Sequence, residues 1–93
     1  LETARASGVS LVIETGRLEV LPDALFYASM GLVPEGTYRN KAYNKKDVRL
    51  EDKVEEALED LVFDPQTSGG LLVSLRREDA EAVLVKLEKL GTL

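Results

Sequence analysis

Cysteine and histidine are both absent from the 93-residue sequence. Without cysteine the chain can form no disulfide, no thiolate metal site and no thiol nucleophile. Without histidine it lacks the most common general base and the most common transition-metal ligand. The absence of cysteine also fits a reducing compartment.

Aromatic residues and positive charge are scarce as well. The five aromatic side chains leave a core built mostly from Leu, Val and Ala. The net charge of −5 argues against a general nucleic-acid binder, because such a protein presents a basic face. No apolar run approaches the length of a membrane span, and the first residues show no signal-peptide pattern. We therefore expect a cytoplasmic protein with no nucleic-acid and no membrane partner.

The two ends of the sequence resemble cut helices. The first residues, LETARASG, are typical of the last turns of a helix, and Gly8 stands where a helix would stop. The last residues, LEKLGTL, follow directly on another helical pattern. We interpret residues 1–93 as a single domain that is truncated at both ends from a longer protein.

The hydrophobic pattern predicts both strands and helices. Residues 9–14 (VSLVIE) and 70–75 (GLLVSL) are apolar and read as strands. Three other segments combine helical spacing of apolar residues with typical helix-end residues. These predicted helices are residues 21–31, 51–60 and 77–91. The order predicts an α+β (layered α/β) domain, in which a small mixed β-sheet is packed with helices.

Residues 33–46 show no periodicity and read as a long loop. This part of the chain is also its basic region, with a charge of +4 between residues 39 and 49 and −9 in the remainder. The charged side chains of the basic segment are Arg39, Lys41, Lys45, Lys46, Arg49 and the single acid Asp47. Two interpretations stay open, a solvated loop and a platform that binds an anion or a phosphate.

The sequence DPQTSGG at residues 64–70 separates two apolar runs. Pro65 fixes its own φ angle and favours an extended Asp64, and the two glycines permit close approach of a ligand or another backbone. Successive N–H groups in such a loop can form an anion-binding nest. The lysine of the common phosphate-binding loop is absent, and the glycines lead into a predicted strand instead of a helix. A structural turn and a ligand-binding loop are both compatible with these residues.

Three stretches of the chain resemble one known enzyme family. The segment FDPQTSGGLL is similar to the signature of the C-terminal half of selenophosphate synthetase, also called selenide, water dikinase. The segments ARASGVSLVI (residues 4–13) and MGLVPEGTYRNK (residues 30–41) resemble two further stretches of that half. The order and spacing of these segments fit across nearly the whole chain.

This resemblance implies an ATP-dependent phosphotransferase that makes selenophosphate, AMP and phosphate from selenide, ATP and water. It implies a two-domain, homodimeric parent whose N-terminal domain holds ATP and Mg²⁺ and supplies the catalytic residues. The present chain would then be the C-terminal domain, inactive alone and without a bound cofactor or metal. The implied fold is the C-terminal domain of the aminoimidazole ribonucleotide synthetase superfamily, which is partly ferredoxin-like.

The resemblance also implies roles for particular residues. The loop would help to close the active-site cleft by approaching phosphates or the other domain, while its first residues would shape it. The contact candidates are Thr67, Ser68, Gly69, Gly70, Arg39 and Asn40, and the loop-shaping residues are Asp64, Pro65 and Gln66. The alternatives are another ATP-using enzyme of the superfamily, similar to a thiamine-phosphate kinase or a hydrogenase-maturation protein, and a non-catalytic ligand-binding module.

Overall fold

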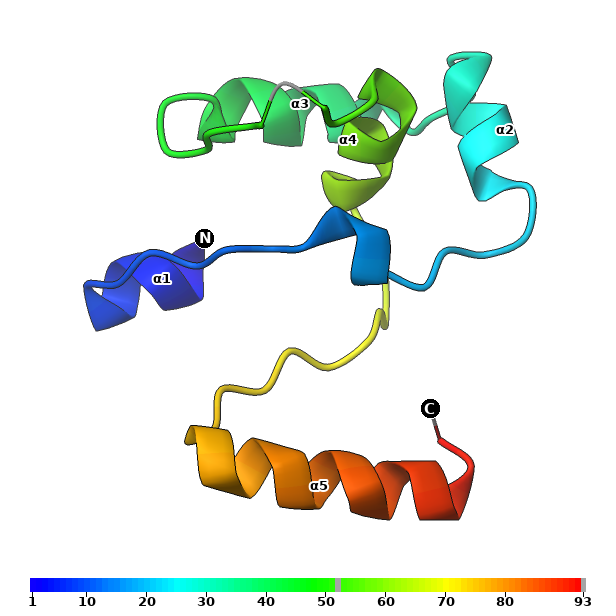
Figure 1. Cartoon of the computed structure of the whole chain (residues 1–93). Coiled ribbons are helices and arrows are strands. Elements are labelled where there is room, and N and C mark those ends of the chain that lie inside the picture. Colours follow the sequence, from blue (N-terminus) through cyan, green and yellow to red (C-terminus); the bar gives the residue numbers. More distant parts are fainter. Residues whose placement is uncertain (52, 93) are drawn as a thin grey trace.

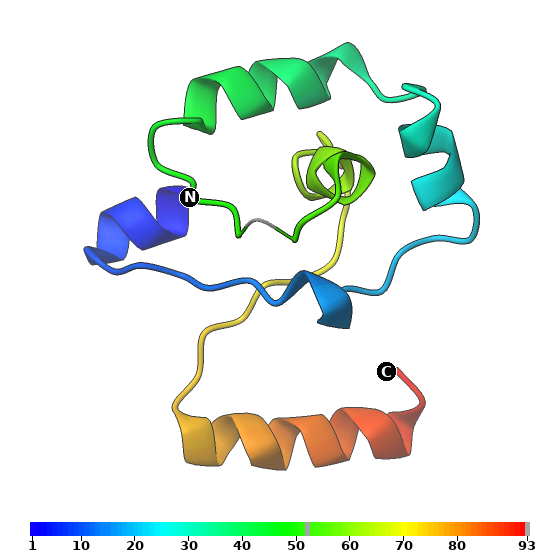
Figure 2. The same ribbon diagram turned by 45° about the horizontal axis from the view of Figure 1, so that its top comes forward.

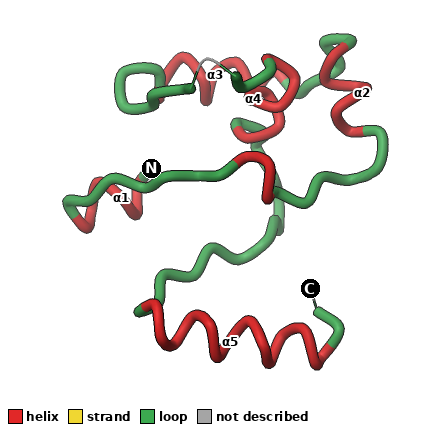
Figure 3. Tube along the Cα trace, viewed as in Figure 1, coloured by secondary structure: helices red, strands yellow, loops and turns green. Residues whose placement is uncertain are grey.

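The computed structural model describes residues 1–51 and 53–92 (Figure 1). Within these ranges the chain forms five α-helices and one 3₁₀ helix, and no residue lies in a strand (Figure 3). The elements are α1 (Glu2–Ser7), η1 (Thr15–Arg17), α2 (Ala24–Ser29), α3 (Glu35–Asn44), α4 (Glu56–Val62) and α5 (Arg77–Leu90).

The predicted α+β architecture is therefore wrong, and so is the ferredoxin-like sheet. Residues 9–14 and 70–75 form irregular connections between helices, not strands. They are open to solvent, with Val12 89% exposed and Leu71 94% exposed. Apolar, β-branched residues favour an extended backbone, but a strand exists only when a second segment completes its hydrogen-bond ladder. The apolar composition of the two segments therefore did not predict whether they find a pairing partner.

The long loop predicted over residues 33–46 is also wrong, because most of it is the helix α3. Pro34 is the N-cap residue and Glu35 lies in the first turn, where an acid is favourable. Glu35 also forms an ion pair with Arg39 one turn later, at 3.5 Å. The helix has no apolar stripe and its buried residue is Thr37, so hydrophobic periodicity could not detect it.

The other helices agree more closely with the sequence. The predicted helix at 77–91 is α5, and Gly91 closes it with a left-handed φ of 66°. The helix predicted over residues 21–31 is shorter, since α2 spans Ala24–Ser29. The helix predicted over residues 51–60 is displaced along the chain, because α4 spans Glu56–Val62.

Helices α2, α3 and α4 form the packed part of the molecule. Helix α4 contacts both of the others, and Figure 2 looks nearly along it, with α2 and α3 around it. The buried side chains in this cluster come from each helix and from the residue after α4: Ala28, Thr37, Asp60 and Phe63. Two of these four are polar, so hydrogen bonds and ion pairs, together with apolar contact, define how α3 meets α4.

Helix α1 is tied to the region just after α3. Arg5 forms an ion pair with Asp47 and lies 5.8 Å from the centre of the Tyr43 ring. The hydrogen bond with Asp47 raises the pKa of Arg5 above its ordinary value. Both side chains of the pair are partly exposed, so it contributes orientation more than stability.

Much of the chain lies open to solvent. Helix α5 stands apart from the α2–α3–α4 cluster in both ribbon views (Figures 1 and 2). The radius of gyration is 15.0 Å, against about 12 Å for a compact chain of this length. The accessible surface is 8366 Å², against about 5,300 Å² for a compact protein of 10.2 kDa. None of the described helices is long and apolar enough to cross a membrane.

Candidate functional site

The loop at residues 64–70 starts from a fixed point at the end of α4. The Phe63 side chain is 8% exposed, and its carbonyl oxygen accepts a hydrogen bond from Asn40 Nδ2 at 2.9 Å. Pro65 lies against Gly36 of α3, where an added Cβ would come 2.8 Å from the proline Cγ. Both contacts come from one helix, so α3 supports the start of the loop.

The middle of the loop is folded by local contacts. The Gln66 N–H donates a hydrogen bond to the Asp64 carbonyl oxygen at 2.9 Å. The Gln66 side chain then lies over Gly69, because a Cβ added to Gly69 would collide with Gln66 Oε1. The folded part of the loop thus rests on contacts of Asp64, Pro65 and Gln66.

The unusual backbone angle in the loop belongs to a serine. Ser68 has φ 55°, in the left-handed region, whereas neither Gly69 nor Gly70 has a φ in that region. The two glycines therefore do not supply the conformation that other residues avoid. A Cβ added to Gly70 would have no atom within 4 Å, so what this glycine contributes is open space beside its backbone.

The loop borders a solvent-open hollow of about 490 Å³. Its lining consists of Leu21, Asp64, Gln66, Thr67, Ser68, Gly69 and Gly70. All four loop residues predicted to contact a ligand thus lie together at one surface. The lining contains one carboxylate, that of Asp64, and no lysine or arginine. An anion held here would depend on backbone N–H groups and on cations from elsewhere.

The two candidates from α3 lie outside this lining. The Arg39 side chain is 74% exposed and is paired with Glu35. Asn40 contacts the residue that precedes the loop, because its side-chain amide donates a hydrogen bond to the Phe63 carbonyl oxygen. Gly36, which was not among the predicted site residues, lies against Pro65. Its spacing of four residues from Asn40 places both on one face of α3, but no helix was predicted there from the sequence, so this spacing carried no signal.

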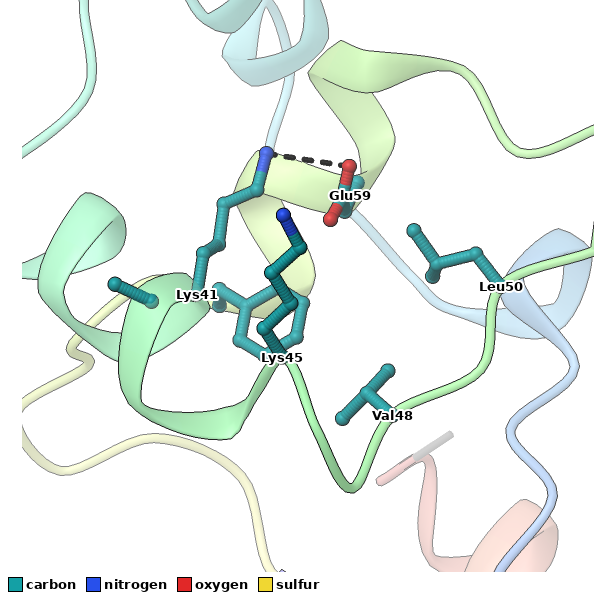
Figure 4. A pocket seen from close by; sticks show the side chains of 7 residues that line it. Lys41, Lys45, Val48, Leu50 and Glu59 are labelled. Atoms are coloured by element: carbon teal, nitrogen blue, oxygen red, sulfur yellow. Dashed lines mark ion pairs between the residues drawn. The ribbon is translucent and has the colours of Figure 1, made fainter.

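A second hollow, of about 530 Å³, lies beside the contact between α3 and α4 (Figure 4). Its lining combines charged and apolar side chains: Lys41, Ala42, Lys45, Val48, Leu50, Glu59 and Phe63. Lys41 Nζ lies 2.8 Å from Asp60 Oδ1 and 3.2 Å from Glu59 Oε2. Partial burial lowers the pKa of Lys41, but the hydrogen bonds to the two carboxylates outweigh it, so that pKa lies above its ordinary value. Lys41 is thus engaged within the protein.

The basic segment is consequently less available to an outside anion than its composition indicated. Arg39 and Lys41 both have carboxylate partners. No cluster of three or more possible metal-ligating side chains occurs in the ranges 1–51 and 53–92. The loop hollow therefore gathers four of the six predicted contact residues, those of the loop itself.

Comparison with known proteins shows which family shares this arrangement of segments. The chain is 41% identical over its whole length to a selenide, water dikinase of Clostridioides difficile. It is 44% identical over 99% of its length to selenide, water dikinase 2 of Peptoclostridium acidaminophilum. The corresponding protein of Nitratidesulfovibrio vulgaris is 42% identical over 98% of the chain.

The chain is homologous to part of the selenide, water dikinases. This confirms the resemblance drawn from the three sequence segments. The chain spans about a quarter of the length of these relatives, 27% of the first and 26% of each of the other two. No protein-family model matches the chain, and no solved structure matches it.

Proposed function

We propose that this chain is the C-terminal domain of a two-domain selenide, water dikinase, which makes selenophosphate, AMP and phosphate from selenide, ATP and water. The observation that supports it is the sequence identity of about 40% along the whole chain to proteins that all bear that name. The relatives are about four times as long as the chain, which leaves room for an ATP-binding domain. The same proposal includes a homodimeric, cytoplasmic parent.

The proposal assigns ATP, Mg²⁺ and the catalytic residues to the part of the parent outside this chain. The loop hollow offers a single carboxylate, and the described residues contain neither cysteine nor histidine. Mg²⁺ in phosphoryl-transfer sites is usually held by one or two carboxylates together with phosphate oxygens, and its charge neutralises the transferring group. Asp64 is too isolated to form such a site without partners.

The loop at residues 64–70 would help to close the active-site cleft. Phosphoryl transfer depends mainly on positioning and on stabilising charge, so backbone N–H groups held close to a phosphate can contribute. Gly70 is exposed and has nothing within 4 Å of its missing Cβ, which leaves its backbone accessible to a large group. Thr67 and Ser68 add hydroxyl groups on the same surface.

The experiment is Gly70→Ala in a full-length protein that contains this chain. The substitution meets no atom and forces no positive φ, so the folded structure should be retained. If a phosphate or the other domain approaches here, selenide-dependent AMP formation per folded molecule should fall by about tenfold, which corresponds to about 1.4 kcal/mol of transition-state binding.

Gly16→Ala provides the matched control, because Gly16 also has free space and no positive φ, and it lies in η1. Thermal unfolding of both variants separates loss of structure from loss of rate. Normal turnover in Gly70→Ala would contradict the functional role of the loop and leave it as a structural turn.

A further inference from the structure

Two sequence motifs that are distant in the chain meet in the structure. Gly36 and Asn40 belong to the segment MGLVPEGTYRNK, and they contact residues of the segment FDPQTSGGLL. Because they are four residues apart in α3, they lie one above the other on the same helix face. Gly36 faces Pro65, and Asn40 faces the Phe63 carbonyl oxygen, so the pair touches the loop on both sides of Asp64.

The contact at Gly36 is too close for any other residue type. An added Cβ would lie 2.8 Å from Pro65 Cγ and 3.2 Å from Pro65 Cβ. The first distance is well inside van der Waals contact, and the proline ring is rigid, so the loop would have to move. Glycine at residue 36 therefore sets how closely the loop approaches α3.

The contact between Asn40 and Phe63 requires a hydrogen-bond donor at residue 40. Phe63 is the C-cap residue of α4, and the last carbonyl groups of a helix have no partner within that helix. The Asn40 amide supplies the missing hydrogen-bond donor at 2.9 Å, in a partly buried position. Aspartate has nearly the same shape but would place a carboxylate oxygen against the carbonyl oxygen. The amide thus fixes the point at which the chain leaves α4 and enters the loop.

We propose that Gly36 and Asn40 are positioning residues, which together form a platform on α3 that sets the place of residues 64–70 relative to the hollow. Asn40 then acts through the loop backbone and not as a ligand of the substrate. The consequence for turnover rests on the proposed function, whereas the consequence for loop geometry does not.

The first test is a double-mutant cycle in the full-length protein, with Gly36→Ala, Pro65→Ala and the double variant. Gly36→Ala should displace the loop and lower turnover by about 10- to 100-fold, since a misplacement of about 1 Å can have that effect. Pro65→Ala removes Cγ, the atom that the new methyl group would strike. The double variant should therefore be at least about threefold faster than Gly36→Ala alone, which would demonstrate energetic coupling between the two motifs.

The second test follows the loop directly, by amide NMR signals of the protein labelled with ¹⁵N-glycine. Asn40→Asp should shift the signals of Gly69 and Gly70, because the hydrogen bond to Phe63 is lost. Asn44→Asp is the matched control, with the same substitution on the same helix. The control should leave both signals in place, and Asn40→Asp should lower kcat with little change in KM, as expected for a group that positions without binding ground-state substrate.

Two outcomes distinguish this inference from the proposed function. If the double variant is no faster than Gly36→Ala and the glycine signals do not respond to Asn40→Asp, the positioning role of Gly36 and Asn40 is wrong. A different result separates the two proposals. The glycine signals shift, the thermal stabilities of the Gly36→Ala and Pro65→Ala variants are not additive, and Gly70→Ala keeps full turnover. In that case the positioning role of Gly36 and Asn40 is supported and the catalytic role of the loop is wrong.

Discussion

The ion pair of Lys41 with Asp60 and Glu59 should be the main polar stabilisation of the α3–α4 contact. Asp60 is 7% exposed at its side chain, and Lys41 and Glu59 are each 21% exposed. A solvent-exposed ion pair contributes about 0–1 kcal/mol, and loss of one partner from a fully buried pair costs about 3–5 kcal/mol. The exposures lie between these limits and closer to the buried one. We therefore expect Lys41→Met to destabilise the contact by about 2 kcal/mol.

Native-state hydrogen exchange of the α3 and α4 amides measures this effect, because it reports local opening. A loss of about 2 kcal/mol lowers protection by about 30-fold. Methionine keeps most of the length and apolar packing of the lysine side chain and leaves Asp60 buried without its charged partner. Lys45→Met is the matched control on the same helix. Lys45 is the C-cap residue of α3, where a cation contributes about 0.3–1 kcal/mol.

The pH dependence has a definite sign. The pKa of Lys41 is raised in the folded protein, whereas lysine in an unfolded chain titrates near about 10.4. The stabilisation from Lys41 is therefore complete below about pH 10.4 and is lost as the pH rises through the folded pKa. Thermal unfolding followed by circular dichroism should show the wild type converging on Lys41→Met above that pH. Equal protection in Lys41→Met and Lys45→Met at neutral pH would refute the reasoning.

Three other predictions follow from burial and composition. Thr37→Val should stabilise α3 by about 1 kcal/mol in the same exchange experiment, because Thr37 is 0% exposed and its hydroxyl has no hydrogen-bond partner in the described structure. A loss of protection would contradict this. The 93-residue chain alone should form no selenophosphate, since it has neither cysteine nor histidine; selenide-dependent AMP formation above a blank without protein would disprove it. The isolated chain should self-associate through its exposed apolar segments, more strongly at high salt because the net charge of −5 is then screened. Sedimentation as a strict monomer at about millimolar concentration would count against it.

The sequence predicted those elements of the fold that local residues specify, and it failed where an element depends on contacts with distant segments. Helix α5 combines an apolar stripe, acids in its first turn and a terminal Gly91, so local information was sufficient. Helix α3 lacks such a stripe, since its buried residue is Thr37 and its side-chain hydrogen bonds to other segments come from Asn40 and Lys41, and the lack of periodicity led to a predicted loop there. The strand predictions failed for another reason. Sheet formation requires a partner segment at the right register, and no local pattern specifies it.

The candidate site shows the same division between chemistry and geometry. Residue types alone left a structural turn and a ligand-binding loop both open for residues 64–70, and the family resemblance favoured the loop. The structure gathers six of these seven residues around one hollow. Gly36 and Asn40 contact Pro65 and Phe63, which are far away in the sequence. No local pattern could therefore predict these contacts. The family resemblance implied Asn40 as a candidate contact, and its side-chain amide can donate a hydrogen bond either to a phosphate oxygen or to a carbonyl oxygen. Because α4 ends at Val62, the Phe63 carbonyl oxygen has no partner within that helix, and the Asn40 amide donates a hydrogen bond to it at the point where the loop begins.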